Sequence, residues 1–158
     1  MNQTTTQGLE RFVEAQASVY HTVVAELAMG HKETHWMWFI FPQLKELGKS
    51  AMAKRFGITS ADEARAYLAH PLLGSRLVEC TKLLLAQRNA NAFEIFGSPD
   101  NLKLRSCMTL FSVAVPEESA FKQALDVFFA GKADEATLKL LAAAAHVPRS
   151  ITVPLSEA

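Results

Sequence analysis

The sequence predicts an all-α fold: a single domain of about six helices, with one central buried helix surrounded by the others. Three observations support this prediction. Apolar residues recur at intervals of three and four along most of the chain, which is the period of an amphipathic helix. Glycine and proline interrupt the pattern at positions typical of helix ends. With 158 residues, 49% of them hydrophobic, the chain is long enough to bury one core.

The first predicted helix begins at Leu9 and ends at Gly30. Its apolar stripe runs through Phe12 and Val19, and glycine at the end readily takes the left-handed conformation that terminates helices. Gln16 lies on this stripe, where a buried amide must find hydrogen-bond partners or cost about 1–3 kcal/mol. Two interpretations follow: a satisfied core glutamine, or a glutamine that faces a pocket.

The middle of the chain is divided by clear start and stop signals. A capping-box pattern at 60–63 begins a short helix that ends at Ala69. The His-Pro pair at 70–71 breaks it, because the residue before proline avoids the helical region and proline suits a first turn. The next helix is expected over 71–87, followed by a short helical stretch over 91–96.

The central helix is predicted over 98–114. Ser98 suits an N-cap, and Asp100 suits the positive end of a helix. Apolar residues occur on several sides of this helix, which is typical of a helix at the centre of its domain. Two more helices are expected over 116–131 and 134–145.

The expected domain covers residues 8–145, with flexible ends over 1–7 and 146–158, where no helical period is present. The run 36–41 contains six large apolar residues and is too short for its period to separate strand from helix. Because no second strand is available to pair with it, we expect a short buried helix or an extended loop.

Composition excludes several classes of function. The formal net charge is zero, from 16 basic and 16 acidic side chains, whereas duplex-binding domains normally carry a basic excess. We therefore expect no duplex nucleic acid as partner. Cys80 and Cys107 form no CxxC pair or disulfide framework, which favours a cytoplasmic location. No apolar run approaches the roughly 20 residues of a membrane span, so no membrane association is expected.

The most unusual segment is His35–Gln43, which reads HWMWFIFPQ. A histidine buried beside two tryptophans would stay neutral and could both give and take a proton, as acid–base catalysis requires. Trp36 and Trp38 offer flat surfaces on which a base or sugar ring can stack. The alternative is that both tryptophans pack in the core and His35 makes only a structural hydrogen bond.

A second group of polar residues lies on the predicted central helix, where Lys103 and Ser106 share a face. An unpaired buried ammonium is costly, so Lys103 requires a partner. It can pair with Asp100 one helical turn away. It can also line an anion-binding pocket together with nearby hydroxyl groups, aided by the start of the helix. The two explanations are compatible.

Metal and cysteine chemistry are disfavoured. His31 and His35 have the spacing of two ligands on one helix face, but no third ligand is evident. Cys107 lies in an apolar helix, where a lone cysteine is normally a small core residue. No metal and no cofactor are therefore predicted.

A resemblance to a known family rests on the string 30–44, which reads GHKETHWMWFIFPQL. It resembles the signature of the bacterial domain-of-unknown-function family 1810, some of whose members carry the genome label calpastatin. Further matches continue to about residue 142: Arg11-Phe12, Ala15-Gln16, Leu47-Gly48, Ser50, Glu63-Ala64, Tyr67-Leu68, His70 to Gly74, Arg76-Leu77, Phe96-Gly97, Asp100, Lys103-Leu104, Ser106 and Met108 to Phe111. The resemblance implies an all-helical fold with one buried helix, and it supplies no activity.

The resemblance also implies that polar residues at its motif positions gather around a ligand. We therefore predict a domain that binds, with hydrolysis as an extension, a small anionic nucleotide-like ligand between the segment 35–38 and the helix of Lys103 and Ser106. His35 is the predicted catalytic residue. The predicted ligand contacts are Gln16, Lys32, Trp36, Trp38, Gln43, Arg76, Lys103 and Ser106.

Two other interpretations stand beside this one. The aromatic segment could form a partner or dimer interface in a non-catalytic interaction module, since aromatic residues anchor such surfaces. The polar residues could also form a satisfied buried network with a purely structural role.

Overall fold

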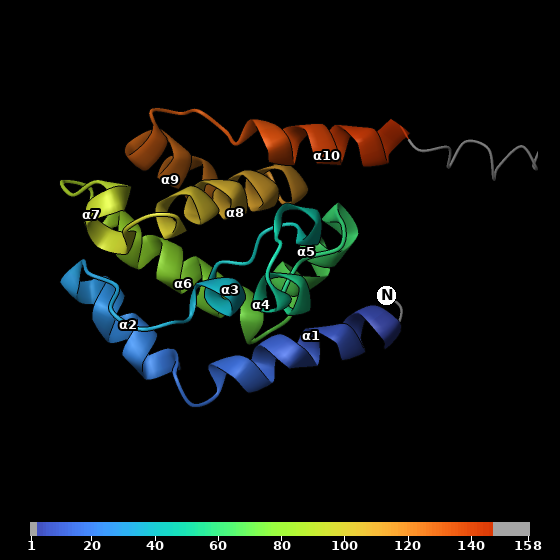
Figure 1. The fold of residues 1–158 in the computed structure, drawn as a ribbon, viewed down its shortest axis with the longest axis horizontal. Helices are drawn as coiled ribbons and strands as arrows, with labels where there is room; N and C mark the ends of the chain where they lie inside the picture. Colours follow the sequence, from blue (N-terminus) through green and yellow to red (C-terminus); the bar gives the residue numbers. More distant parts are fainter. Residues whose placement is uncertain (1–2, 147–158) are drawn as a thin grey trace, which may run out of the picture.

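Helices make up most of residues 3–146, the part of the chain that the computed structural model describes (Figure 1). Within this part there is no β-strand, which confirms the all-α prediction and a single domain. The prediction of about six helices was wrong. The ten α-helices and one 3₁₀ helix within residues 3–146 are α1 (Gln3–Gln16), α2 (Tyr20–Met29), α3 (Met37–Ile40), η1 (Lys45–Leu47), α4 (Ala51–Arg55), α5 (Ala61–Ala69), α6 (Leu73–Leu85), α7 (Ala92–Phe96), α8 (Asp100–Ala114), α9 (Ala120–Phe129) and α10 (Glu135–His146).

The single helix expected from Leu9 to Gly30 is two helices. Helix α1 ends at Gln16 and α2 begins at Tyr20, and Figure 1 shows the two meeting at an angle. The apolar stripe continues across this bend because both helices bury their apolar faces in the same core, with Phe12 and Leu27 fully buried. Periodicity could not reveal the bend because the same face stays buried on both sides. Gly30 ends α2 in the left-handed conformation, as expected.

The break after α5 has a different capping arrangement from the one expected. Helix α5 ends at Ala69, and α6 begins at Leu73 rather than at Pro71. The Nδ1 atom of His70 accepts hydrogen bonds from the backbone N–H groups of Leu72 (3.1 Å) and Leu73 (3.2 Å). His70 therefore satisfies donors at the start of α6 that have no partner within the helix.

Helix α8 occupies the central position predicted for it. It packs against α5, α7, α9 and α10, and most of its length is buried. In Figure 1 it lies below α9 and α10 and above α3, α6 and α1, with α7 beside it. The expected N-cap was wrong: Pro99 rather than Ser98 precedes the first helical residue, and it makes no side-chain capping bond.

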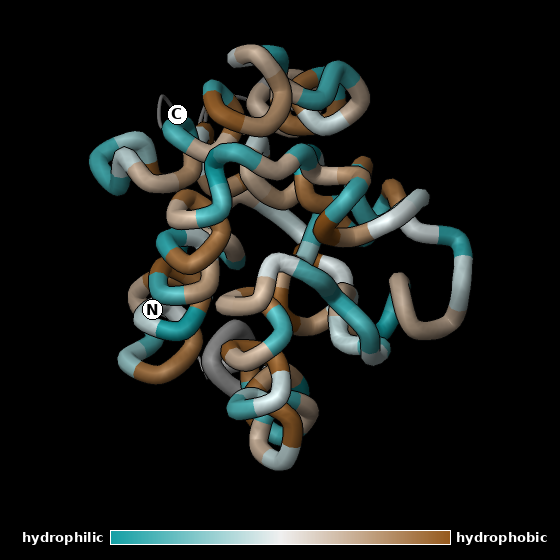
Figure 2. Tube along the Cα trace, turned by 90° about the vertical axis from the view of Figure 1, so that its left-hand side faces the viewer, coloured by the Kyte–Doolittle hydropathy of each residue, from teal (hydrophilic) through white to brown (hydrophobic). Residues whose placement is uncertain are grey.

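Figure 2 shows hydrophobic and hydrophilic residues alternating along the helical coils, the amphipathic pattern from which these helices were predicted.

The aromatic run forms a single buried turn, α3, which agrees with the expected short buried helix. After it, the extended segment around Leu44 lies beside Ile58 and forms one isolated bridge. The backbone N–H of Lys45 donates to the carbonyl of Ile58 (2.8 Å), and the N–H of Ile58 donates to the carbonyl of Gln43 (2.9 Å). At Gly57 a β-carbon would lie 2.3 Å from the Lys45 Cα, so this close approach requires glycine.

The ends of the expected domain are partly within the described chain. Helix α1 begins at Gln3, inside the stretch 1–7, and the flexibility expected for that stretch stays a prediction. The expected tail from 146 lies outside the described residues, apart from the last residue of α10. Along residues 3–146, no helix is both long enough and apolar enough to cross a membrane.

Candidate functional site

Trp36 is a core residue. Only 1% of its surface is exposed, and its Nε1 donates a hydrogen bond of 2.9 Å to Glu26 Oε1. Its ring packs edge-on against Phe96 and obliquely against Phe41, each with a centroid distance of 6.3 Å. The core interpretation therefore describes Trp36, and in this conformation its ring has no free face for a ligand.

Glu26 holds the loop that leads into the aromatic segment. Its carboxylate accepts bonds from the backbone N–H groups of Glu33 (2.8 Å) and Thr34 (3.1 Å) and from the Thr34 hydroxyl (2.8 Å), in addition to Trp36. Burial alone would raise the pKa of Glu26, but these hydrogen bonds outweigh it and leave the pKa below its ordinary value. Sequence reasoning missed this residue. The available signal was a glutamate beside Leu27 on the apolar side of α2.

His35 is exposed, so the expectation of a buried histidine beside the tryptophans was wrong. It lies between Thr34, which is held by Glu26, and the buried Trp36. Its catalytic role stays a prediction. The aromatic segment offers little surface to a partner, because Trp36, Phe39 and Phe41 are buried and only Trp38 is half-exposed.

Two lysines converge on Asp100 at the start of α8. Lys32 Nζ lies 2.9 Å from Asp100 Oδ2, and its side chain is only 8% exposed. The expected pair of Lys103 with Asp100 is present at a longer distance of 3.9 Å. Each ammonium also lies over an indole ring: Lys32 is 5.1 Å from the Trp36 centroid and Lys103 is 5.7 Å from the Trp38 centroid. The sequence therefore predicted the pair of Lys103 with Asp100, but not that Lys32 lies closer to Asp100.

Three of the predicted ligand contacts, Trp38, Gln43 and Lys103, line one cavity, which we call the Lys103 cavity. Its free volume is about 10 Å³, room for about one water molecule. The rest of its wall consists of Met37, Phe41, Ala53 and Phe56. The structure therefore brings these three residues together without a ligand-sized space between them.

Ser106 and Cys107, the neighbours of Lys103 on α8, are occupied within the core. The Ser106 hydroxyl donates to the carbonyl of Leu102 in its own helix (3.3 Å). Cys107 is fully buried, and burial raises the pKa of its thiol. A thiol held in its protonated form is a poor nucleophile, which agrees with its predicted role as a core residue.

Gln16 and Arg76 belong to a separate network. Gln16 Nε2 donates to the carbonyl of Phe39 (2.8 Å) and to the Tyr67 hydroxyl (3.1 Å), while its Oε1 accepts from Arg76 Nη1 (3.1 Å). The Arg76 guanidinium stacks 4.3 Å from the centroid of the Tyr20 ring. Burial raises the pKa of Tyr67, which keeps this hydroxyl protonated. Gln16 is thus a satisfied core glutamine, and neither it nor Arg76 lines the Lys103 cavity.

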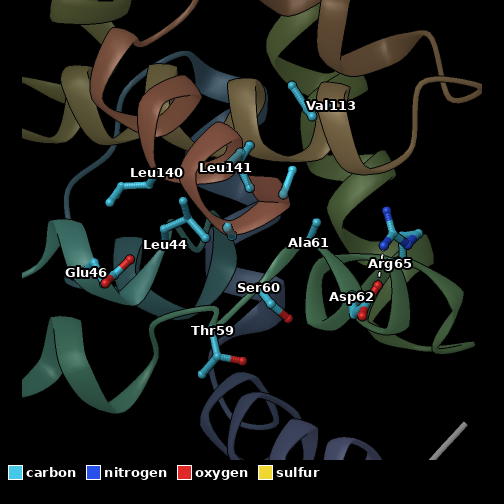
Figure 3. Close-up of a pocket in the computed structure, with 12 residues that line it drawn as sticks. Leu44, Glu46, Thr59, Ser60, Ala61, Asp62, Arg65, Val113, Leu140 and Leu141 are labelled. Atoms are coloured by element: carbon cyan, nitrogen blue, oxygen red, sulfur yellow. Dashed lines mark hydrogen bonds and ion pairs between the residues drawn. The ribbon is translucent and has the colours of Figure 1, made fainter. Parts of the chain in front are cut away.

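A much larger hollow lies at another place, between α10, the start of α5 and the segment that follows Gln43 (Figure 3). We call it the α10 groove. Its volume is about 530 Å³, and no predicted site residue lines it. The lining residues are Leu44, Glu46, Thr59, Ser60, Ala61, Asp62, Arg65, Val113, Leu140, Leu141, Ala144 and Ala145. Sequence reasoning missed this hollow because leucine and alanine at helical spacing look like ordinary core.

Within the described residues, no three His, Cys, Asp or Glu side chains lie close enough together to hold a metal ion. The features that bear on function include the paired lysines with their indole rings, the Gln16–Arg76 network and the α10 groove.

The fold and these features define a small all-α domain whose polar residues are held in internal networks. The chain belongs to the family described as protein of unknown function (DUF1810), whose profile matches residues 6–141. It is similar to a solved structure, the conserved hypothetical protein Rv1873 from Mycobacterium tuberculosis, at 52% identity and a TM-score of 0.84. That similarity covers 85% of this chain and 96% of the other. No curated protein matches the chain.

Proposed function

We propose that the domain binds a small anionic, nucleotide-like ligand at the Lys103 cavity. One observation carries the proposal: Trp38 from α3, Gln43 from the segment after it and Lys103 from α8 meet at one place. A cation, an aromatic face and an amide are the groups that bind the phosphate, ring and polar edge of such a ligand.

The charges around Asp100 favour an anion. Lys32 and Lys103 contribute two positive charges and Asp100 one negative charge, which leaves one positive charge. Lys32 is the close partner of Asp100, whereas Lys103 is 3.9 Å away and keeps hydrogen-bond donors for a ligand. In this proposal Lys32 neutralises Asp100 and Lys103 binds the ligand.

The size of the cavity determines how a ligand binds. A free volume of about 10 Å³ holds no phosphate or ring, so the ligand occupies the mouth of the cavity or displaces its walls. Trp38 is half-exposed and packs under the Lys103 ammonium, so these two side chains are the ones that have to move. Binding should therefore change the tryptophan fluorescence of the chain, and Trp38→Phe, which leaves only the buried Trp36, should remove that change.

The other predicted contacts take indirect roles in this proposal. Trp36, Gln16, Arg76 and Ser106 hold the fold around the site rather than touch the ligand. Hydrolysis through His35 stays a prediction, as does the cytoplasmic location.

A thermal-shift screen with nucleotides, sugar phosphates and ADP-ribose-type metabolites tests the proposal. A ligand present at 100 times its Kd stabilises the fold by about 2.7 kcal/mol. Lys103→Met should abolish the shift, and Lys139→Met on the exposed face of α10 should leave it unchanged. The proposal fails if no compound in the panel raises the melting temperature, or if the shift survives Lys103→Met in a folded variant.

A further inference from the structure

The α10 groove has the dimensions of a ligand site. Its volume of about 530 Å³ falls within the roughly 300–1,000 Å³ of small-molecule pockets. Four parts of the chain form it: the segment at Leu44, the start of α5, the end of α8 near Val113 and the second half of α10. Because α8 rises about 1.5 Å per residue, Val113 is about 15 Å along the helix from Lys103. The groove is therefore separate from the Lys103 cavity.

The floor of the groove is apolar. Figure 3 shows Leu44, Leu140 and Leu141 gathered at its centre, between polar residues on either side. Val113, at the edge of this floor, is 45% exposed although it lies on the central helix. Apolar surface left open in this way is stabilised when an apolar group covers it.

The charges at the two ends of the groove are unequal. Figure 3 shows Asp62 and Arg65 together at one end, where they form an ion pair, and Glu46 at the other. Glu46 has no ion-pair partner among the described residues. The carboxylate of Asp62 is balanced by the guanidinium of Arg65, so the one net negative charge of the lining is that of Glu46.

We propose that the α10 groove binds a small amphipathic cation, an amine with an alkyl or aryl body. The body covers the leucine floor, and the ammonium lies at Glu46. A neutral amphiphile would gain no ionic attraction from this carboxylate, only a hydrogen bond at most. An anionic amphiphile would be repelled by it and could reach Arg65 only by displacing Asp62. The preferred charge is opposite to that of the ligand proposed for the Lys103 cavity.

Three probes with one alkyl body separate these cases: octylamine, octanol and octanoate, each titrated into the full chain and followed by methyl NMR. We expect saturable shifts at the methyl groups of Leu44, Leu140 and Leu141, with octylamine binding most tightly. Glu46→Gln should remove the preference of octylamine over octanol, about two- to fivefold for a solvent-exposed ion pair. The proposal is overturned if octanoate binds as tightly as octylamine, or if the shifts lie elsewhere.

A pair of matched variants locates the site. Val113→Trp should fill the groove and weaken octylamine at least about tenfold, whereas Leu138→Trp should have no effect. The two positions have similar exposure (45% and 38%), but Leu138 does not line the groove. Circular dichroism confirms that each variant folds, and the methyl shifts in the unmodified protein stand independently of both.

Two other occupants give distinct results, and either would overturn the proposal. If deletion of residues 147–158 strengthens octylamine binding more than tenfold, the groove belongs to the chain's own C-terminal segment. If light scattering shows self-association that Val113→Trp abolishes, the groove binds a second copy. Lys103→Met should leave octylamine binding unchanged, so failure here is distinguishable from failure of the proposed anion site.

Discussion

The Lys103 cavity and the α10 groove differ in two respects: the functional groups that surround them and the free volume that they enclose. Around the cavity, two lysines, a carboxylate, two indole rings and an amide lie together, yet about 10 Å³ is free. The groove offers about 530 Å³, and seven of its twelve lining residues are leucine, alanine or valine. The first region has the groups that recognise a ligand and the second has the room.

The difference shows that charged and aromatic residues indicate a candidate site in the sequence, whereas apolar residues that line a hollow do not. Charged and aromatic groups on apolar elements are conspicuous in a sequence because burying them is costly without partners. A hollow has no such signal, because its walls are the same apolar residues that elsewhere fill a core. Because Trp36 and Glu26, which support the region around the cavity, are buried in the core, their substitution should destabilise the fold far more than substitutions in the groove.

The largest effect is expected at Trp36. Trp36→Ala removes a fully buried ring and the hydrogen bond to Glu26, so the free energy of unfolding should fall by about 3–5 kcal/mol. Trp38→Ala, at the half-exposed neighbour, should cost about 1 kcal/mol. Urea denaturation of both variants measures the difference. Equal losses would contradict the division between a structural and an accessible tryptophan.

Glu26 should have the next largest effect. Glu26→Gln replaces a carboxylate that accepts four hydrogen bonds by an amide with one accepting oxygen, at a cost of about 1.5–3 kcal/mol. Because the folded-state pKa lies below the ordinary value of 4.5, this stabilisation is present above that pH. It is lost as the pH falls through the folded-state pKa.

The pH dependence of unfolding separates this contribution from other effects of the substitution. Urea midpoints measured from pH 7 down to pH 3 should fall more steeply in the wild type than in Glu26→Gln. Parallel curves would mean that the carboxylate charge does not hold the loop at Glu33 and Thr34.

The two lysines should differ from each other. Lys32→Met leaves a largely buried Asp100 with only the distant Lys103, and it should cost about 1–3 kcal/mol. Lys103→Met removes the weaker pair and should cost less than about 1 kcal/mol. Thermal denaturation at low and moderate salt measures both. If Lys103→Met is the more damaging, its ammonium is structural and the proposed anion site loses its cation.

The smallest effect is expected in the groove. Val113→Ser should change the free energy of unfolding by no more than about 0.5 kcal/mol, because the side chain is partly exposed and borders empty space. Leu138→Ser provides a comparison at similar exposure outside the groove. A loss above about 2 kcal/mol at Val113 alone would mean that the groove is closed in solution.

The fold class and most helix ends could be predicted from the sequence because helices carry their own periodic and capping signals. The prediction failed at the bend after Gln16 and in the short helices near Ala51, where tertiary contacts set the chain direction. The side-chain bonds of Gln16 to Phe39 and Tyr67 depend on contacts that no local pattern encodes.

The candidate site could be predicted only in part. The helical spacing of Asp100 and Lys103 indicated their pairing, and Trp38 and Gln43 belong to the unusual aromatic segment. The sequence could not predict that Arg76 lies apart from Lys103, because the position of a residue on its helix does not show how two helices are placed relative to each other.

The bridge at Ile58 has a mechanical consequence. Two backbone hydrogen bonds fix Gln43 and Lys45 to that residue, and in extended chain neighbouring side chains point to opposite sides. Gln43 therefore lines the small cavity while Leu44 lines the large groove. This segment forms part of the wall of both hollows, so a ligand that displaced Gln43 in the cavity would also move Leu44 in the groove. Occupancy of the two hollows would be linked, and the linkage would be equal in both directions.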